Sequence, residues 1–247
     1  MKTSYLLRFS VILLLVLLTL SMVMNGLLFN YARQYYLDLN AVRLDPLGLD
    51  NDVMTVPDST KTAVVFFGDS RAARWPALSG LTRFEFINRG IEAQTSAQVL
   101  QRFDYQIKPL RPRVIVVQVG VNDLKTIPLF PDRKTAIVAA CEDNIRQIAA
   151  RGSEIGSIVV LTTIFPVGEV PLERRLFWSP DISVAVVEVN TYIHSLAKSG
   201  VIVFDAYSLL SDNGVLQRQY AEDELHLSTL GYKTLNDQLA LALSNIQ

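Results

Sequence analysis

The chain has 247 residues, half of them hydrophobic, and its 23 Lys and Arg residues nearly balance 24 Asp and Glu residues. This length accommodates one sizeable α/β core with an additional segment. Because the charges balance and no basic run is present, the sequence has no basic surface of the kind that binds nucleic acid, and nucleic acid is not an expected partner. The single cysteine, Cys141, excludes an internal disulfide, and its helical spacing with Ile137, Ile145 and Ile148 predicts a position in the core.

The amino terminus contains an uncharged apolar run from Phe9 to Phe29. As a helix, this run is long enough to cross the roughly 30 Å hydrocarbon core of a bilayer. We predict a retained transmembrane anchor over residues 1–29. The alternative is a cleaved signal peptide, for which Thr19 and Ser21 offer small residues. Large carboxy-terminal domains translocate largely regardless of flanking charge, which predicts an extracytoplasmic domain, periplasmic or extracellular.

A juxtamembrane stalk is predicted over residues 30–61, where prolines, a glycine and several aspartates interrupt any periodicity. Within it, the stretch from Tyr31 to Leu44 either extends the helix or packs on the domain, and the pattern does not separate these alternatives. The catalytic domain is predicted over residues 62–247.

From Thr62 onward, short β-branched runs alternate with longer amphipathic stretches. The predicted strands are residues 63–67, 84–88, 114–119, 158–163 and 201–204. The predicted helices are residues 71–78, 96–106, 134–151, 182–198 and 229–245. This alternation predicts a mostly parallel five-stranded sheet with helices on both faces. A ligand site in such a fold lies outside the carboxyl ends of the strands.

Three of the loops that directly follow predicted strands carry groups suited to stabilising an oxyanion. Ser70 opens a helix after the first strand, Gly90 presents a backbone N–H after the second, and Asn122 adds an amide donor after the third. A serine hydroxyl is a weak nucleophile by itself, so the hypothesis requires a neighbouring base.

Only two histidines are available to supply that base. His194 falls on the polar side of the helix predicted over 182–198 and is interpreted as a solvated surface residue. His226 lies in a loop, three residues after Asp223, at a spacing that lets the carboxylate orient the imidazole. We therefore predict His226 as the general base and Asp223 as its partner.

Four segments, FFGDSRAA, NRGIEAQ, VGVND and DELHLSTLGY, resemble in order the four blocks of the SGNH (GDSL-type) hydrolases. The resemblance runs from Thr62 to the end of the chain. It implies a flavodoxin-like, three-layer αβα sandwich, a triad of Ser70, Asp223 and His226, and an oxyanion hole of Ser70, Gly90 and Asn122. It implies no metal or organic cofactor. Arg71 stands where the family usually has an aliphatic or small polar residue, which bears on specificity.

Other patterns carry weaker hypotheses. An aspartate follows each of three predicted strands, at Asp69, Asp123 and Asp205. An alternative hypothesis makes these carboxylates the ligands of a Mg²⁺ site for phosphoryl transfer, but it gives His226 no role. The segment over residues 164–180 is long for a loop and contains Trp178, a candidate substrate contact; it forms either a lid or a packed structural loop.

Three residues beside the nucleophile support one further hypothesis. Two interpretations are open for Arg71, Arg74 and Trp75. They form either a site for an anionic substrate, with Arg71 as a candidate substrate contact, or a solvated helix face, which we slightly prefer.

The sequence thus predicts an anchored serine esterase acting on acyl, principally acetyl, esters of an envelope saccharide or lipid. Two alternatives stay open. One is an O-acyltransferase with the same triad, because the acyl-enzyme half-reaction is identical. The other is a catalytically silent, membrane-anchored binding protein that keeps the fold. The oligomeric state is not predicted.

Overall fold

The computed structural model describes residues 2–50, 57–58, 60–198 and 200–246. It divides into two compact units, residues 1–52 and 53–247, which are described separately. Residues 51–56 and 59 of the predicted stalk lie outside the described residues.

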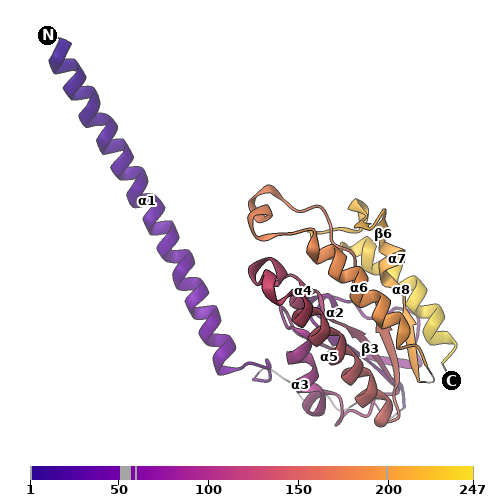
Figure 1. The fold of residues 1–247 in the computed structure, drawn as a ribbon. Helices are drawn as coiled ribbons and strands as arrows, with labels where there is room; N and C mark the ends of the chain where they lie inside the picture. Colours follow the sequence, from indigo (N-terminus) through magenta and orange to yellow (C-terminus); the bar gives the residue numbers. More distant parts are fainter. Residues whose placement is uncertain (1, 51–56, 59, 199, 247) are drawn as a thin grey trace. The chain divides into compact units, whose positions relative to one another are not determined.

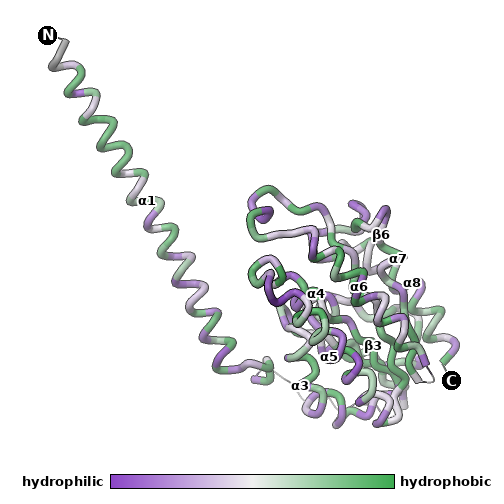
Figure 2. The backbone as a smooth tube through the Cα atoms, viewed as in Figure 1, coloured by the Kyte–Doolittle hydropathy of each residue, from purple (hydrophilic) through white to green (hydrophobic). Residues whose placement is uncertain are grey.

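The first unit is dominated by one helix, α1 (Lys2–Leu44). The helix continues through Tyr31 to Leu44, the stretch for which two alternatives were open, and it ends before Pro46, whose ring cannot follow in a helix. Apolar side chains are exposed along α1. Figure 2 shows that the amino-terminal half of this helix is mostly hydrophobic and that hydrophilic residues become more frequent toward its carboxyl-terminal end. The part from Tyr5 to Leu44 is long and apolar enough to cross a membrane, a criterion that signal sequences also meet.

The second unit is built on a five-stranded parallel sheet with strand order β2-β1-β3-β4-β5. The strands are β1 (Thr62–Gly68), β2 (Phe84–Gly90), β3 (Val114–Gln118), β4 (Ile158–Thr162) and β5 (Val201–Phe204). Each lies within two residues of a predicted strand. In the sheet, β2 lies on one side of β1 and β3 on the other, so the connections that follow β1 and β3 run in opposite directions. In folds of this type the ligand site lies where these connections separate, outside the carboxyl ends of β1 and β3.

Helices cover both faces of the sheet (Figure 1). One face packs against α3 (Ser96–Gln106), α5 (Lys134–Glu154) and α6 (Asp181–Ser195). The other face packs against α7 (Ala206–Leu210) and α8 (Thr229–Ser244). Alternate residues of β1 enter the two cores, Val65 and Phe67 the first and Val64 and Phe66 the second. The three-layer αβα architecture is confirmed.

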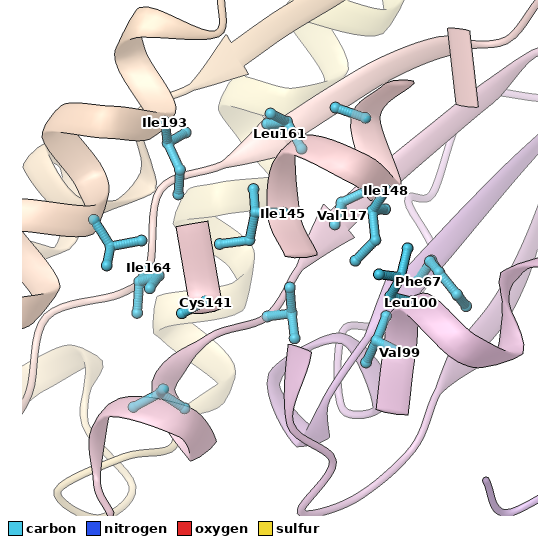
Figure 3. Packing of buried hydrophobic residues seen from close by; sticks show 14 of the residues in the cluster. Phe67, Val99, Leu100, Val117, Cys141, Ile145, Ile148, Leu161, Ile164 and Ile193 are labelled. Carbon is cyan, nitrogen blue, oxygen red and sulfur yellow. The ribbon is translucent and has the colours of Figure 1, made fainter. Parts of the chain in front are cut away.

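Figure 3 shows the core between the sheet and the first helical layer, in which Phe67, Val117 and Leu161 of the strands meet Ile145 and Ile148 of α5. Cys141 lies in this core, wholly buried, as its helical spacing predicted.

The short elements are where prediction and structure differ. They are α2 (Ser70–Ala73), α4 (Val121–Leu124), α7, the strand pair β6 (Ser211–Asp212) and β7 (Val215–Leu216), and the 3-10 helices η1 (Ile127–Leu129), η2 (Pro131–Arg133), η3 (Leu172–Phe177) and η4 (Arg218–Tyr220). The helix predicted over 71–78 is wrong in length, because Pro76 disfavours helical backbone at Trp75 and α2 ends after one turn.

Candidate active site

The site begins at the tight connection between β1 and α2. Gly68 ends the strand so close to β3 that a Cβ there would lie 1.7 Å from Gln118 O, a contact that only glycine avoids. Asp69 caps α2, its Oδ1 accepting the N–H of Arg71 at 2.9 Å. Ser70 is thereby placed as the first residue of α2, with 5% of its surface exposed.

The structure brings Ser70, His226 and Asp223 into one hydrogen-bonded row. His226 Nε2 lies 3.1 Å from Ser70 Oγ, and His226 Nδ1 lies 2.8 Å from Asp223 Oδ2. The other carboxylate oxygen, Asp223 Oδ1, accepts the backbone N–H groups of Leu225 and His226, each at 2.7 Å. A proton on Nδ1 therefore leaves Nε2 as an acceptor facing the serine hydroxyl.

Two opposing influences act on the pKa of Asp223. Partial burial pulls the pKa upward, but the hydrogen bonds from the His226 side chain and from the Leu225 and His226 N–H groups together outweigh it and lower the pKa below its ordinary value. The carboxylate is therefore ionised at neutral pH, which is the form that stabilises an imidazolium beside it.

The three predicted oxyanion donors lie at the carboxyl ends of β1, β2 and β3. The Ser70 N–H makes no hydrogen bond to any described residue. Asn122 Nδ2 donates to Gln94 O at 2.9 Å, which fixes the amide and uses one of its two protons. The Gly90 N–H, predicted to be available to an oxyanion, already donates a hydrogen bond to Asn88 Oδ1 at 2.8 Å. Gly90 would therefore have to share its proton to contact an oxyanion.

Arg71 and Trp75 contradict the prediction of a solvated helix face. Both side chains are buried. The Arg71 guanidinium donates to Leu225 O at 2.7 Å and to Phe165 O at 3.1 Å, and it lies over the Phe165 ring. Arg71 is thus directed away from solvent and joins the turn between β1 and α2 to the loop that contains His226, an arrangement that leaves it no surface for substrate.

Arg74, the third residue of that hypothesis, is partly exposed. It forms ion pairs with Glu92 at 3.0 Å and Glu222 at 3.6 Å. Its charge is already paired with carboxylates, which weakens the anionic-substrate hypothesis.

Sequence reasoning missed a buried arginine beneath the site. Arg102 of α3 donates to the carbonyls of Gly68 and Arg89, so it ties the end of β1 to the end of β2. Its spacing from Val99 and Phe103 places it on the buried face of α3, and a charged residue on an otherwise apolar face was the available signal.

The segment over residues 164–180 has a packed part and an exposed part. Its first part is packed, with Phe165 wholly buried and Gly168 N donating to Glu224 O at 2.9 Å. Its second part contains the exposed η3, whose Arg174 pairs with the buried Glu224. Trp178 is partly buried and lines a surface pocket of about 290 Å³.

A second pocket, of about 500 Å³, is lined in part by Asp223. Its lining residues are Glu169, Pro171, Val215, Leu216, Arg218, Ala221, Glu222, Asp223 and Glu224. Four of these nine residues are acidic and one is basic, so the pocket disfavours an anionic group.

The residues of the alternative hypotheses have other partners. Asp123 accepts the N–H and the hydroxyl of Ser96, and Asp205 caps α7 through Ser208. His194 is half exposed, as predicted, with Nε2 3.8 Å from Asp205 Oδ2. Within the described part of the chain, no group of three or more His, Cys, Asp or Glu side chains is arranged to hold a metal ion.

Comparisons with known proteins were made for the whole chain. A family model described as the GDSL-like lipase/acylhydrolase family matches residues 58–234. A search of curated protein sequences gave no match. Among solved structures, a GDSL-like lipase from Bacteroides thetaiotaomicron is similar, with a TM-score of 0.61 and 24% identity, over 78% of this chain and 93% of that one.

Two further solved structures are similar at lower identity. One is an acetyl xylan esterase, with a TM-score of 0.59 and 20% identity, over 73% of this chain and 99% of that one. The other is a variant of an acetyl-xylooligosaccharide esterase from Geobacillus, with a TM-score of 0.59 and 14% identity, over 76% of this chain and 95% of that one. These likenesses show the fold.

Proposed function

Since the chain belongs to the GDSL-like lipase/acylhydrolase family and is a carboxylic ester hydrolase, we propose that Ser70, His226 and Asp223 are its catalytic triad. The observation that carries the proposal is the hydrogen-bonded row from Asp223 through His226 to the Ser70 hydroxyl. Such a row supplies a nucleophile, a base within proton-transfer distance and a carboxylate that orients the base.

In the proposed acylation step, His226 Nε2 takes the hydroxyl proton as Ser70 Oγ forms a bond to the ester carbonyl carbon. Asp223 stabilises the resulting imidazolium without taking its proton. The tetrahedral intermediate then breaks its bond to the alcohol oxygen, which receives the proton from His226. A water molecule then gives a proton to the same imidazole as its oxygen forms a bond to the acyl carbon. The bond between that carbon and Ser70 Oγ breaks, Oγ takes the proton back from His226, and the carboxylic acid leaves.

The negative charge of the tetrahedral intermediate needs donors that are already in place. We propose the Ser70 N–H and the Asn122 amide as the principal pair, because the first has no other acceptor among the described residues and the second is held by Gln94 O. Gly90 is the third donor, sharing its N–H between the oxyanion and Asn88 Oδ1.

The substrate we propose is an acetyl ester of an envelope saccharide. Two of the similar structures are named for acetyl xylan or acetyl-xylooligosaccharide esterases. The acidic pocket beside Asp223 favours an uncharged, hydroxyl-rich alcohol over an anionic one. An ester of a lipid remains the other substrate class, and a sugar hydroxyl in place of water would make the enzyme an O-acyltransferase.

The domain organisation is also proposed. We propose residues 1–29 as a retained anchor, residues 30–61 as the juxtamembrane segment and residues 62–247 as a catalytic domain outside the cytoplasm. The length and apolar character of α1 support the anchor. Amino-terminal sequencing of the mature membrane-bound protein would detect cleavage after Thr19 or Ser21.

The proposal is tested by measuring hydrolysis of p-nitrophenyl esters graded from acetyl to long acyl, with the full chain, Ser70→Ala and His226→Ala. We expect turnover highest for acetyl and lost in both variants. Rates that rise with chain length would favour a lipid. Transfer of the acetyl group to added saccharide at the expense of free acetate would identify an acyltransferase. Equal rates for wild type and Ser70→Ala above the uncatalysed rate would exclude Ser70 as the nucleophile, and rates of both at the uncatalysed level would favour a catalytically silent binding protein.

A further inference from the structure

Five large apolar side chains are exposed on two segments that follow strands of the sheet. They are Leu129 and Phe130 after β3, and Leu172, Leu176 and Phe177 after β4, and we call them the apolar rim. Leu176 and Leu172 are 83% and 76% exposed, the two highest values for large hydrophobic residues among the described residues of the second unit. Exposed apolar clusters of this kind mark interaction surfaces.

The apolar rim lies at the catalytic edge of the domain. The first segment follows the carboxyl end of β3, the neighbour of β1, and the second follows the carboxyl end of β4, the next strand in the sheet. Both segments project from the same end of the domain in Figure 1. Arg174 of η3 pairs with Glu224, two residues before His226. Lys134, at the end of the first segment, donates through Nζ to Asp181 Oδ1 at 2.7 Å, just after the second segment, so the two segments lie close together.

Basic side chains accompany the apolar ones. Residues 125–134 and 169–178 together contain five Lys or Arg and three Asp or Glu residues, and two of the basic side chains, Lys134 and Arg174, are paired with carboxylates outside these ranges. The Arg133 guanidinium lies 5.9 Å from the centre of the Phe130 ring, so a cation stands directly beside an exposed aromatic face. Exposed apolar side chains with an adjacent cation are typical of surfaces that enter the headgroup region of a bilayer.

From these observations we propose that the apolar rim docks the catalytic edge on the surface of a lipid bilayer. The α1 helix, long and apolar enough to cross a membrane, would hold the domain beside such a surface at a high effective concentration, where weak contacts suffice. The exposed side chains are spread over two projecting turns, an arrangement that fits a fluid lipid surface better than the continuous complementary patch of a protein partner. This docking is independent of the proposed triad.

The test uses the full chain in vesicles of phosphatidylcholine and phosphatidylglycerol, with an environment-sensitive nitrobenzoxadiazole label on Leu176→Cys. Cys141 does not compete for the label, because it is wholly buried and burial raises its thiol pKa. The matched control is Leu241→Cys, at a residue of α8 that is 61% exposed.

We expect the label on Leu176→Cys to emit at shorter wavelength in vesicles and to be quenched by lipids brominated in the acyl chain, while the label on Leu241→Cys shows neither effect. Leu172→Ser with Phe177→Ser should remove most of both effects and leave turnover of a soluble acetyl ester unchanged. Equal spectra for the two labels would overturn the proposal. So would a shift that depends on protein density without lipid quenching, because it would identify a second copy of the chain as the occupant.

Discussion

The ionisation of Asp69, directly before the proposed nucleophile, couples the stability of the domain to pH. The side chain is wholly buried, its Oδ1 accepts the Arg71 N–H, and its Oδ2 has no partner among the described residues. Burial raises the pKa of Asp69 from 3.8 to about 6, against the opposing charge of Arg71. An acid with a raised folded-state pKa contributes stability below its unfolded pKa and loses it as the pH rises through the folded pKa.

The magnitude follows from that shift. Taking about 1.4 kcal/mol per pKa unit, ionisation of Asp69 costs the folded state about 3 kcal/mol between roughly pH 4 and pH 7. Asp69→Asn keeps an oxygen acceptor for the Arg71 N–H but does not titrate. The free energy of unfolding of the variant should therefore rise relative to wild type, across this range, by about that amount.

Urea unfolding of the full chain in detergent micelles measures the difference, with Trp75 as the fluorescent reporter because it is buried in the folded domain. Other carboxyl groups, such as Asp223 and Asp205, have lowered pKa values and make the free energy of unfolding rise with pH. They are present in both proteins, so their contribution cancels in the difference between the variant and wild type. Parallel curves of unfolding free energy against pH for wild type and Asp69→Asn would refute the reasoning from burial.

Three further outcomes follow from the geometry of the site. Arg71→Met leaves the carbonyl oxygens of Leu225 and Phe165 without their donor. The variant should lower the free energy of unfolding, measured by urea titration, by about 2 to 5 kcal/mol, and a loss below about 1 kcal/mol would show that the contact contributes little. Asn122→Ala should lower kcat for an acetyl ester by on the order of 10² to 10³ with a smaller change in KM, and a variant within a few-fold of wild type would remove Asn122 from the oxyanion hole. Gly68→Ala would force a Cβ to 1.7 Å from Gln118 O and should yield little folded domain in thermal melts, whereas a wild-type melting temperature would contradict that packing.

The long elements of the domain could be predicted because their periodicity is set by local burial. Four of the strands are nearly continuous apolar runs, and β2 begins with alternating apolar residues. Helices α5 and α6 repeat apolar residues at helical spacing, so the predicted boundaries differ from the observed ones by at most three residues. Placement of polar residues directly after these strands is what predicted that Ser70 and Asn122 share one edge of the sheet.

The site was predicted less completely, because its remaining features depend on contacts between distant parts of the chain. The burial of Arg71 requires carbonyl oxygens from Phe165 and Leu225, which lie 94 and 154 residues away in sequence. The residues around Arg71 in the sequence do not indicate that these carbonyl oxygens are its partners. The use of the Gly90 N–H by Asn88 Oδ1 depends on one side-chain rotamer, which the sequence does not specify.

The central claim, that Ser70 is a nucleophile activated by His226, is tested most directly by covalent labelling with a fluorophosphonate followed by intact-protein and peptide mass spectrometry. The account predicts one adduct per wild-type chain, located on Ser70, no adduct in Ser70→Ala, and labelling of His226→Ala slowed by orders of magnitude. An adduct on another residue, or labelling of Ser70→Ala to the same extent as wild type, would contradict it.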